Sequence, residues 1–170
     1  MTSGTKSYLI GCHQFLLHPL WVLLAWLDTY KSWPTWREFV CMLIHDVGVC
    51  GRDYLKGNNK EGHGELGAFW AYKLFGMEYG LFCLGHSDEE LLECEYKDTD
   101  IRAARSKLFI PDKLSFLYAP LWWLKFVQQV EGFNKVCTAE QFLDKIRKNR
   151  DDGFPVGSNH QHYKDFAGIK

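Results

Sequence analysis

Apolar residues recur every three or four positions along most of this chain, which is the spacing of helices that bury one face. Three segments open such helices with a capping box, in which a Ser or Thr and a Glu or Gln three residues later satisfy backbone N–H groups of the first turn. These boxes begin at Thr35, Ser87 and Thr138. The first predicts a helix that runs to about Val47 and ends at Gly48, and the third predicts an amphipathic helix.

Other helices follow from apolar runs and from the Gly and Pro residues that interrupt them. One is predicted over about residues 13–30, with Pro19 as its bending point, and another over about residues 62–76. A long apolar helix is predicted after Pro111, with a kink at Pro120. No run of alternating Val, Ile or Thr predicts a strand, so the expected fold class is all-α.

Length, composition and charge limit the domain count and the classes of partner. A chain of 170 residues is long enough for one domain with a substantial core and short for two. Hydrophobic residues make up 46% and charged residues 24%, the balance of a globular protein. We expect a helical domain over residues 1–150 and a flexible tail over 151–170. The net charge of −1 argues against a nucleic acid duplex or an anionic membrane as partner.

The cysteines and the apolar N-terminal segment bear on the cellular compartment. Six cysteines are scattered without a CxxC pair, which is typical of free thiols in a reducing compartment. No cleavable signal precedes them. Residues 8–27 are apolar, but His13, Gln14, His18 and Pro19 interrupt them, so a buried helix is expected instead of a membrane span. The predicted location is the cytoplasm.

Histidines and aspartates recur within or beside these apolar runs. Alone, each is typical of a helix cap or of a hydrogen-bonded core residue. Together they are harder to explain, because burial of ionisable groups is costly unless they pair or bind a metal. Imidazole and carboxylate groups are ligands of divalent metals. The series consists of His18, the adjacent pair His45 and Asp46, His63, His86, and Asp112.

The order of these residues resembles the HD-domain superfamily of metal-dependent phosphohydrolases. His18 precedes an apolar helix with Val22 and Ala25, and the HD pair lies in CMLIHDVGV. Residues 63–68 read HGELGA, a context found in a subset of that family, and residues 112–114 read DKL. The similarity covers about residues 8–130. It implies an all-α bundle of five or more helices.

The resemblance also implies a ligand set and a metal. His18, His45, Asp46 and Asp112 would form a mononuclear site, and His63 and His86 would add a second ion, with Asp46 as the bridge. His13 competes with His18 as first ligand, and the spacing to Val22 favours His18. The family implies one or two divalent transition ions, with Fe or Mn favoured and Zn, Co or Ni as alternatives. No GYP follows the HD pair, which disfavours the cyclic-di-GMP phosphodiesterases.

The implied activity is hydrolysis of a nucleotide or related small phosphate ester by a metal-bound hydroxide. Phosphoryl transfer needs cations near the phosphate oxygens. We expect Arg52 and Lys113 to provide them beside the catalytic Asp46, with Arg105 and Lys107 next in line.

Two other functions remain open. A di-iron oxygenase of the same fold uses the same six ligands, and a non-catalytic module would bind a nucleotide without turnover. Trp122 and Trp123 lie in an apolar helix and are typical of a core or of an interface, so a homodimer is a further expectation.

Overall fold

The computed structural model describes residues 14–49, 63–87, 105–131 and 137–154. Within these ranges the chain forms α-helices and short 3-10 turns and contains no strand, which confirms the all-α prediction. The helices are α1 (Leu17–Tyr30), α2 (Trp36–Ile44), α3 (His63–Phe75), α4 (Met77–Leu84), α5 (Phe109–Ser115), α6 (Leu121–Glu131) and α7 (Ala139–Asp151), with 3-10 turns η1 (Val47–Val49) and η4 (Phe116–Tyr118).

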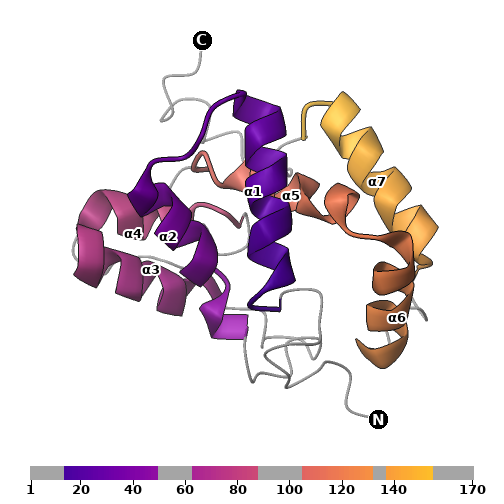
Figure 1. Ribbon diagram of the computed structural model, residues 1–170, viewed down its shortest axis with the longest axis horizontal. Helices are drawn as coiled ribbons and strands as arrows, with labels where there is room; N and C mark the ends of the chain where they lie inside the picture. Colours follow the sequence, from indigo (N-terminus) through magenta and orange to yellow (C-terminus); the bar gives the residue numbers. More distant parts are fainter. Residues whose placement is uncertain (1–13, 50–62, 88–104, 132–136, 155–170) are drawn as a thin grey trace, which may run out of the picture.

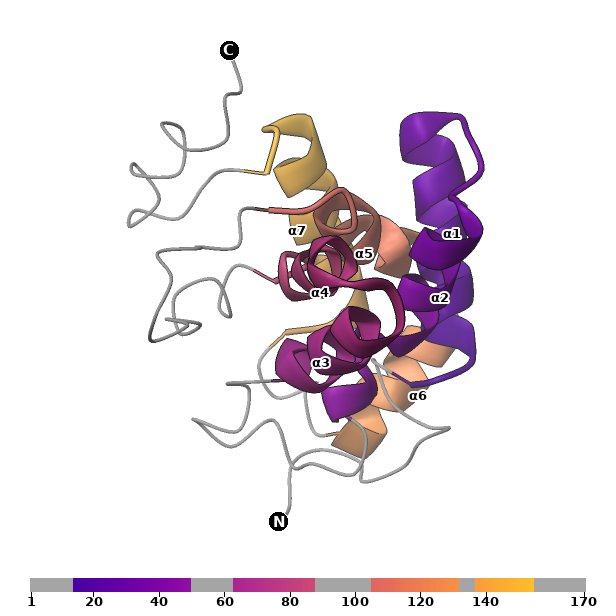
Figure 2. The ribbon, with the colours of Figure 1, turned by 90° about the vertical axis from the view of Figure 1, so that its left-hand side faces the viewer.

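Helix α1 stands between two groups of helices. Figure 1 shows α2, α3 and α4 on one side of it and α5, α6 and α7 on the other. Helix α1 packs mainly against α5, and α3 forms a hairpin with α4 (Figure 2). The arrangement brings the end of α2 and the start of α3 close to α1 and α5, although these elements are far apart in the sequence.

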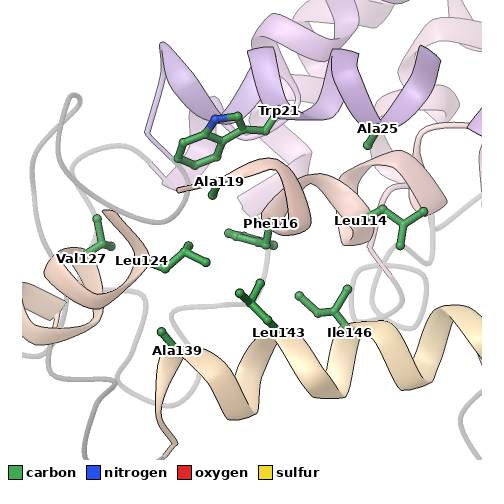
Figure 3. Close-up of a cluster of buried hydrophobic side chains, with 10 residues drawn as sticks. All are labelled: Trp21, Ala25, Leu114, Phe116, Ala119, Leu124, Val127, Ala139, Leu143 and Ile146. Atoms are coloured by element: carbon green, nitrogen blue, oxygen red, sulfur yellow. The ribbon is translucent and has the colours of Figure 1, made fainter. Parts of the chain in front are cut away.

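The largest hydrophobic cluster joins α1, α5, η4, α6 and α7 (Figure 3). Leu124 and Val127 of α6 are almost completely buried in it. Smaller clusters lie between α1 and α2, around Val22 and Met42, and between α2, α3 and α4, around Cys41 and Cys83. Buried apolar area is the main favourable term in folding, so these clusters fix how the helices are placed.

Both capping boxes within the described residues are present. At the start of α2, the Glu38 amide donates to Thr35 Oγ1 at 3.3 Å, and the Thr35 amide donates to Glu38 Oε2 at 2.7 Å. Thr138 and Gln141 make the equivalent pair at α7. Helix α3 ends before Gly76 as predicted, where φ is +94°, a conformation that suits glycine.

Three helix predictions are wrong in their boundaries. Helix α2 ends at Ile44, before the predicted end near Val47, and a 3-10 turn follows over Val47–Val49. The long helix after Pro111 is not kinked but broken: α5 begins earlier, at Phe109, and Ala119 is extended before Pro120. A residue preceding proline is sterically disfavoured in the helical region, which explains the break. Helix α1 begins at Leu17, so Pro19 lies in its first turn, where its missing N–H removes no intrahelical hydrogen bond.

Several predicted features lie outside the described residues. These are His13, residues 88–90 of the second capping box, the loop with Arg52, and residues 155–170 of the tail. Among the helices that are described, none combines the length and the apolar character needed to span a bilayer.

The cluster in Figure 3 predicts unequal effects for two leucines of α6. Replacing Leu124, which is 1% exposed, with Ala should lower the free energy of unfolding by about 2–5 kcal/mol, because it leaves a cavity. Leu121→Ala is the control, since Leu121 is 40% exposed, and should cost clearly less. Urea denaturation measures both. Equal losses would contradict the proposed packing of α6.

Candidate metal centre

The structure brings together all six histidines and aspartates of the series. His18, His45, Asp46 and Asp112 form one group of converging ligand atoms, and all four residues are buried. Asp46, His63 and His86 form a second group, so that Asp46 belongs to both. Within each group the ligand atoms lie within 4.8 Å of one another.

The first group has the spacing of ligands around one ion. His18 Nε2 lies 3.1 Å from Asp112 Oδ1 and 3.1 Å from Asp46 Oδ2. His45 Nε2 lies 3.3 Å from Asp46 Oδ2 and 3.4 Å from Asp112 Oδ1. Metal bonds of about 2.0–2.2 Å place neighbouring ligand atoms roughly 2.8–3.6 Å apart in octahedral or tetrahedral sites. The four residues could therefore hold a metal ion.

The second group uses the other oxygen of the Asp46 carboxylate. Asp46 Oδ1 lies 3.2 Å from His86 Nε2 and 3.8 Å from His63 Nε2, and the two imidazole nitrogens are 3.2 Å apart. One carboxylate thus directs Oδ2 toward the first group and Oδ1 toward the second. Asp46 could therefore contribute one oxygen to each group.

Backbone carbonyls fix which ring nitrogen faces the centre. His45 Nδ1 donates to the Met42 carbonyl at 2.8 Å, and His86 Nδ1 donates to the Cys83 carbonyl at 2.5 Å. A carbonyl only accepts, so Nδ1 carries the proton and Nε2 of the neutral ring presents a lone pair. His45 Nε2 is buried and faces the oxygens of Asp46 and Asp112, as suits a metal ligand.

Ser115 provides a comparable support for His18. Its hydroxyl donates to the Asp112 carbonyl at 2.6 Å, and its oxygen lies 3.5 Å from His18 Nδ1. Because the hydroxyl proton is used, the oxygen can only accept, which favours the tautomer with Nδ1 protonated. Ser115 therefore links the orientations of His18 and Asp112. Sequence reasoning missed it, although it follows Asp112 by one helical turn on α5.

Two glycines allow the chain to approach the HD pair closely. A Cβ atom on Gly67 would lie 2.5 Å from the carbonyl oxygens of Ile44 and His45. A Cβ atom on Gly48 would lie 2.0 Å from the carbonyl oxygen of His63. Only residues without a side chain fit there, so α3 can bring His63 to the centre. The HGELGA segment thus contributes both a ligand and the glycine that positions it.

The carboxylates determine the protonation of the metal-free centre. Burial lowers the pKa of His45, but the charge of Asp46 and the hydrogen bond to Asp112 outweigh it and raise that pKa to about 10. The pKa of His18 is likewise raised, because bonds to Asp112 and Asp46 outweigh burial. Burial raises the pKa of Asp112, but the charge of Lys113 and bonds from His18 and His45 hold it well below its usual range.

The basic residues predicted to bind phosphate differ in their distance from the ligands. Lys113 Nζ lies 3.1 Å from Asp112 Oδ2, whereas His18 Nε2 lies 3.1 Å from Asp112 Oδ1, and the Lys113 side chain is 37% exposed. Arg105 donates to the Phe154 carbonyl at 3.0 Å and stacks on Phe109 at 4.1 Å. Lys113 is therefore close to the ligands, whereas Arg105 holds the end of α7. Arg52 lies outside the described residues, and Lys107 is exposed.

No protein-family model, curated protein or solved structure matches this chain. The class of protein therefore rests on fold and site alone. It is an all-helical protein with a buried histidine–aspartate cluster that can hold a metal ion, which is compatible with an HD-like site.

The close approach at Gly67 predicts a selective loss of metal. Gly67→Ala should push α3 away from the carbonyls of Ile44 and His45 and move His63 away from Asp46, while the first group stays intact. Metal analysis of the purified variant should show one ion fewer than the wild type. Leu74→Ala, at an exposed position of α3, is the control. Unchanged metal content in Gly67→Ala would contradict this account.

The raised pKa values predict that the metal-free protein loses stability as the pH rises. The pKa of His45 is about 10 in the folded protein, against about 6.5 in the unfolded chain. Protonation of His45 therefore stabilises the folded state fully below pH 6.5, and this stabilisation is lost as the pH rises towards 10. Metal affinity should increase over the same range, because the ion displaces these protons. Denaturation of chelator-treated protein at several pH values measures the first effect, and metal titration the second. In Asp112→Asn the free energy of unfolding should depend less on pH, because Asp112 helps to raise the pKa of His45.

Proposed function

We propose that this protein is a metal-dependent phosphohydrolase of the HD type that acts on a nucleotide or a related small phosphate ester. The observation that carries the proposal is the Asp46 carboxylate, whose two oxygens face two groups of ligands at 3.1–3.8 Å. The helical fold and the order of the ligands along the chain support it as well.

The ligand chemistry suits the expected ions. His18, His45, Asp46 and Asp112 would hold one divalent ion, and His63 and His86 with Asp46 would hold another. Imidazole with carboxylate suits Fe, Mn, Zn, Co and Ni, of which we favour Fe or Mn. Such ions supply Lewis acidity, which lowers the pKa of a bound water and polarises a phosphoryl oxygen.

The charge of the site favours an anionic substrate. Two divalent ions bring four positive charges, and Asp46 and Asp112 offset two of them, since the histidines bind as neutral rings. The occupied centre would therefore be cationic although the whole chain carries a net charge of −1. A buried positive centre attracts a phosphate group strongly, because little water screens it.

Protein groups would orient the site and hold the substrate. The carbonyls of Met42 and Cys83 keep the Nε2 atoms of His45 and His86 directed at the centre. Lys113 is close enough to Asp112 to neutralise it and exposed enough to reach a substrate oxygen. Arg52, six residues after Asp46, remains the second cation that we predict from the sequence.

The same bridging carboxylate also fits an HD-fold di-iron oxygenase. Its ligands are identical, so product analysis must separate the two activities. Aerobic, iron-dependent oxidation of a substrate without phosphate release would favour the oxygenase. Stoichiometric nucleotide binding without turnover, with several metals tried, would favour a binding module.

The test is metal analysis followed by a phosphate-release screen over nucleotides. Asp46→Asn should lose most bound metal and most activity, because it weakens both ion sites. Lys113→Ala should keep its metal but lose ~1.5–3 kcal/mol of transition-state stabilisation, as expected for one charge-assisted contact. Lys125→Ala is the matched control, since Lys125 pairs with Glu140 at a 55% exposed position. Full metal content and activity in Asp46→Asn would refute the proposal.

A further inference from the structure

Two cysteines lie together in the core beside the ligand-bearing helix ends. Cys41 belongs to α2 and Cys83 to α4, and both are 0% exposed. Cys83 Sγ lies 3.8 Å from the Cys41 carbonyl oxygen, and the two thiols hydrogen-bond with each other. Both belong to the small hydrophobic cluster between α2, α3 and α4. Two sulfurs that share a hydrogen bond can be joined covalently after a small movement.

Each of these cysteines supports a histidine of the metal centre. The Cys41 carbonyl accepts from the backbone N–H of His45 at 2.9 Å. The Cys83 carbonyl accepts from His86 Nδ1, which leaves His86 Nε2 directed at Asp46. The cysteine pair therefore connects the ends of the two helices that precede His45 and His86. A shift of either cysteine is passed on to a ligand.

The two thiols differ in reactivity. The hydrogen bond with Cys83 lowers the pKa of the Cys41 thiol, whereas that bond and burial raise the pKa of Cys83. The thiolate is the reactive form of cysteine, so Cys41 is the sulfur that reacts first with an oxidant. Because neither residue is exposed, a small oxidant of the peroxide class suits this site.

We propose that Cys41 and Cys83 form a redox switch, in which hydrogen peroxide joins them in a disulfide and thereby weakens metal binding by His45 and His86. The switch rests on the metal centre of the proposed function but not on the reaction that this centre performs. It can therefore be tested without a substrate.

Oxidation takes two steps. The Cys41 sulfur attacks one peroxide oxygen, so that an S–O bond forms and the O–O bond breaks, and the thiol proton leaves with the other oxygen as water. The Cys83 sulfur then attacks the resulting sulfenic acid of Cys41. The S–S bond forms, the S–O bond breaks, and a second water carries away the Cys83 proton. The two thiols lose two electrons, which reduce hydrogen peroxide to water.

The disulfide would displace the supports of the ligands. It draws α2 and α4 together at the cysteines, because a covalent bond is shorter than a contact between two thiols. The Cys83 carbonyl moves with its residue, and the hydrogen bond that orients His86 is distorted. Loss of such a support for a metal-bound histidine typically lowers metal affinity by about 10–100-fold.

The experiment measures zinc binding by the full chain before and after treatment with hydrogen peroxide. Zinc is used because peroxide does not oxidise it. The oxidised wild type should bind zinc roughly tenfold more weakly or worse, and dithiothreitol should restore the affinity. Once the free thiols are blocked, peptide mass mapping should find Cys41 linked to Cys83.

Two variants separate this pair from other thiols. Cys83→Ala removes one partner and should keep its zinc affinity after peroxide treatment. Cys137→Ala is the matched control, because Cys137 is a half-buried free cysteine that lies two residues before α7. It should respond to peroxide as the wild type does. Circular dichroism verifies that both variants are folded.

The proposal fails if peroxide leaves the wild type without the Cys41–Cys83 link, or if the linked protein binds zinc as tightly as before. A folded Cys83→Ala variant that still loses affinity would also refute it. If that variant does not fold, mass mapping and reversal by dithiothreitol in the wild type decide. Absence of phosphate release would count against the proposed reaction alone. A reduced protein that binds no zinc would refute the metal centre and the switch with it.

Discussion

The buried Asp46 carboxylate is the group on which the rest of the structure depends. Its oxygens lie among the Nε2 atoms of four histidines, which come from α1, the end of α2, the start of α3 and the segment after α4. A carboxylate in such a position is costly unless positive charge accompanies it. Metal ions supply that charge in the loaded protein, and protons on His18 and His45 supply part of it otherwise. Metal binding, protonation and stability are therefore linked at one point.

The ends of the surrounding helices position the ligands around Asp46. Helix α2 ends at Ile44, so that His45 and Asp46 follow at the end of the helix and can both face inward. The Met42 and Cys83 carbonyls orient two rings, and the Ser115 hydroxyl orients a third. The hydrophobic clusters on either side of α1 then hold these helix ends in register. The packing of the helices therefore sets the geometry of the ligands.

Helix α3 shows how the requirements of a site affect the outer surface of a protein. Its buried side carries Gly67 where the main chain approaches the carbonyls of Ile44 and His45. A helix of this kind gains little from burying its own side chains, since small residues bury little apolar area. Its large residues lie outside instead.

The sequence by itself determined the helical class, the capping boxes at Thr35 and Thr138 and the end of α3 at Gly76, because capping and periodicity are local properties. The six clustered residues were predicted from their order along the chain and the family that this order resembles. Only the tertiary structure decided the distances that join His18 to Asp112 across 94 positions of the chain, and the support that Ser115 and Gly67 give to the site. It also replaced the predicted kink at Pro120 with a break. The reason is that distances between remote residues depend on how whole helices pack, which no local pattern encodes.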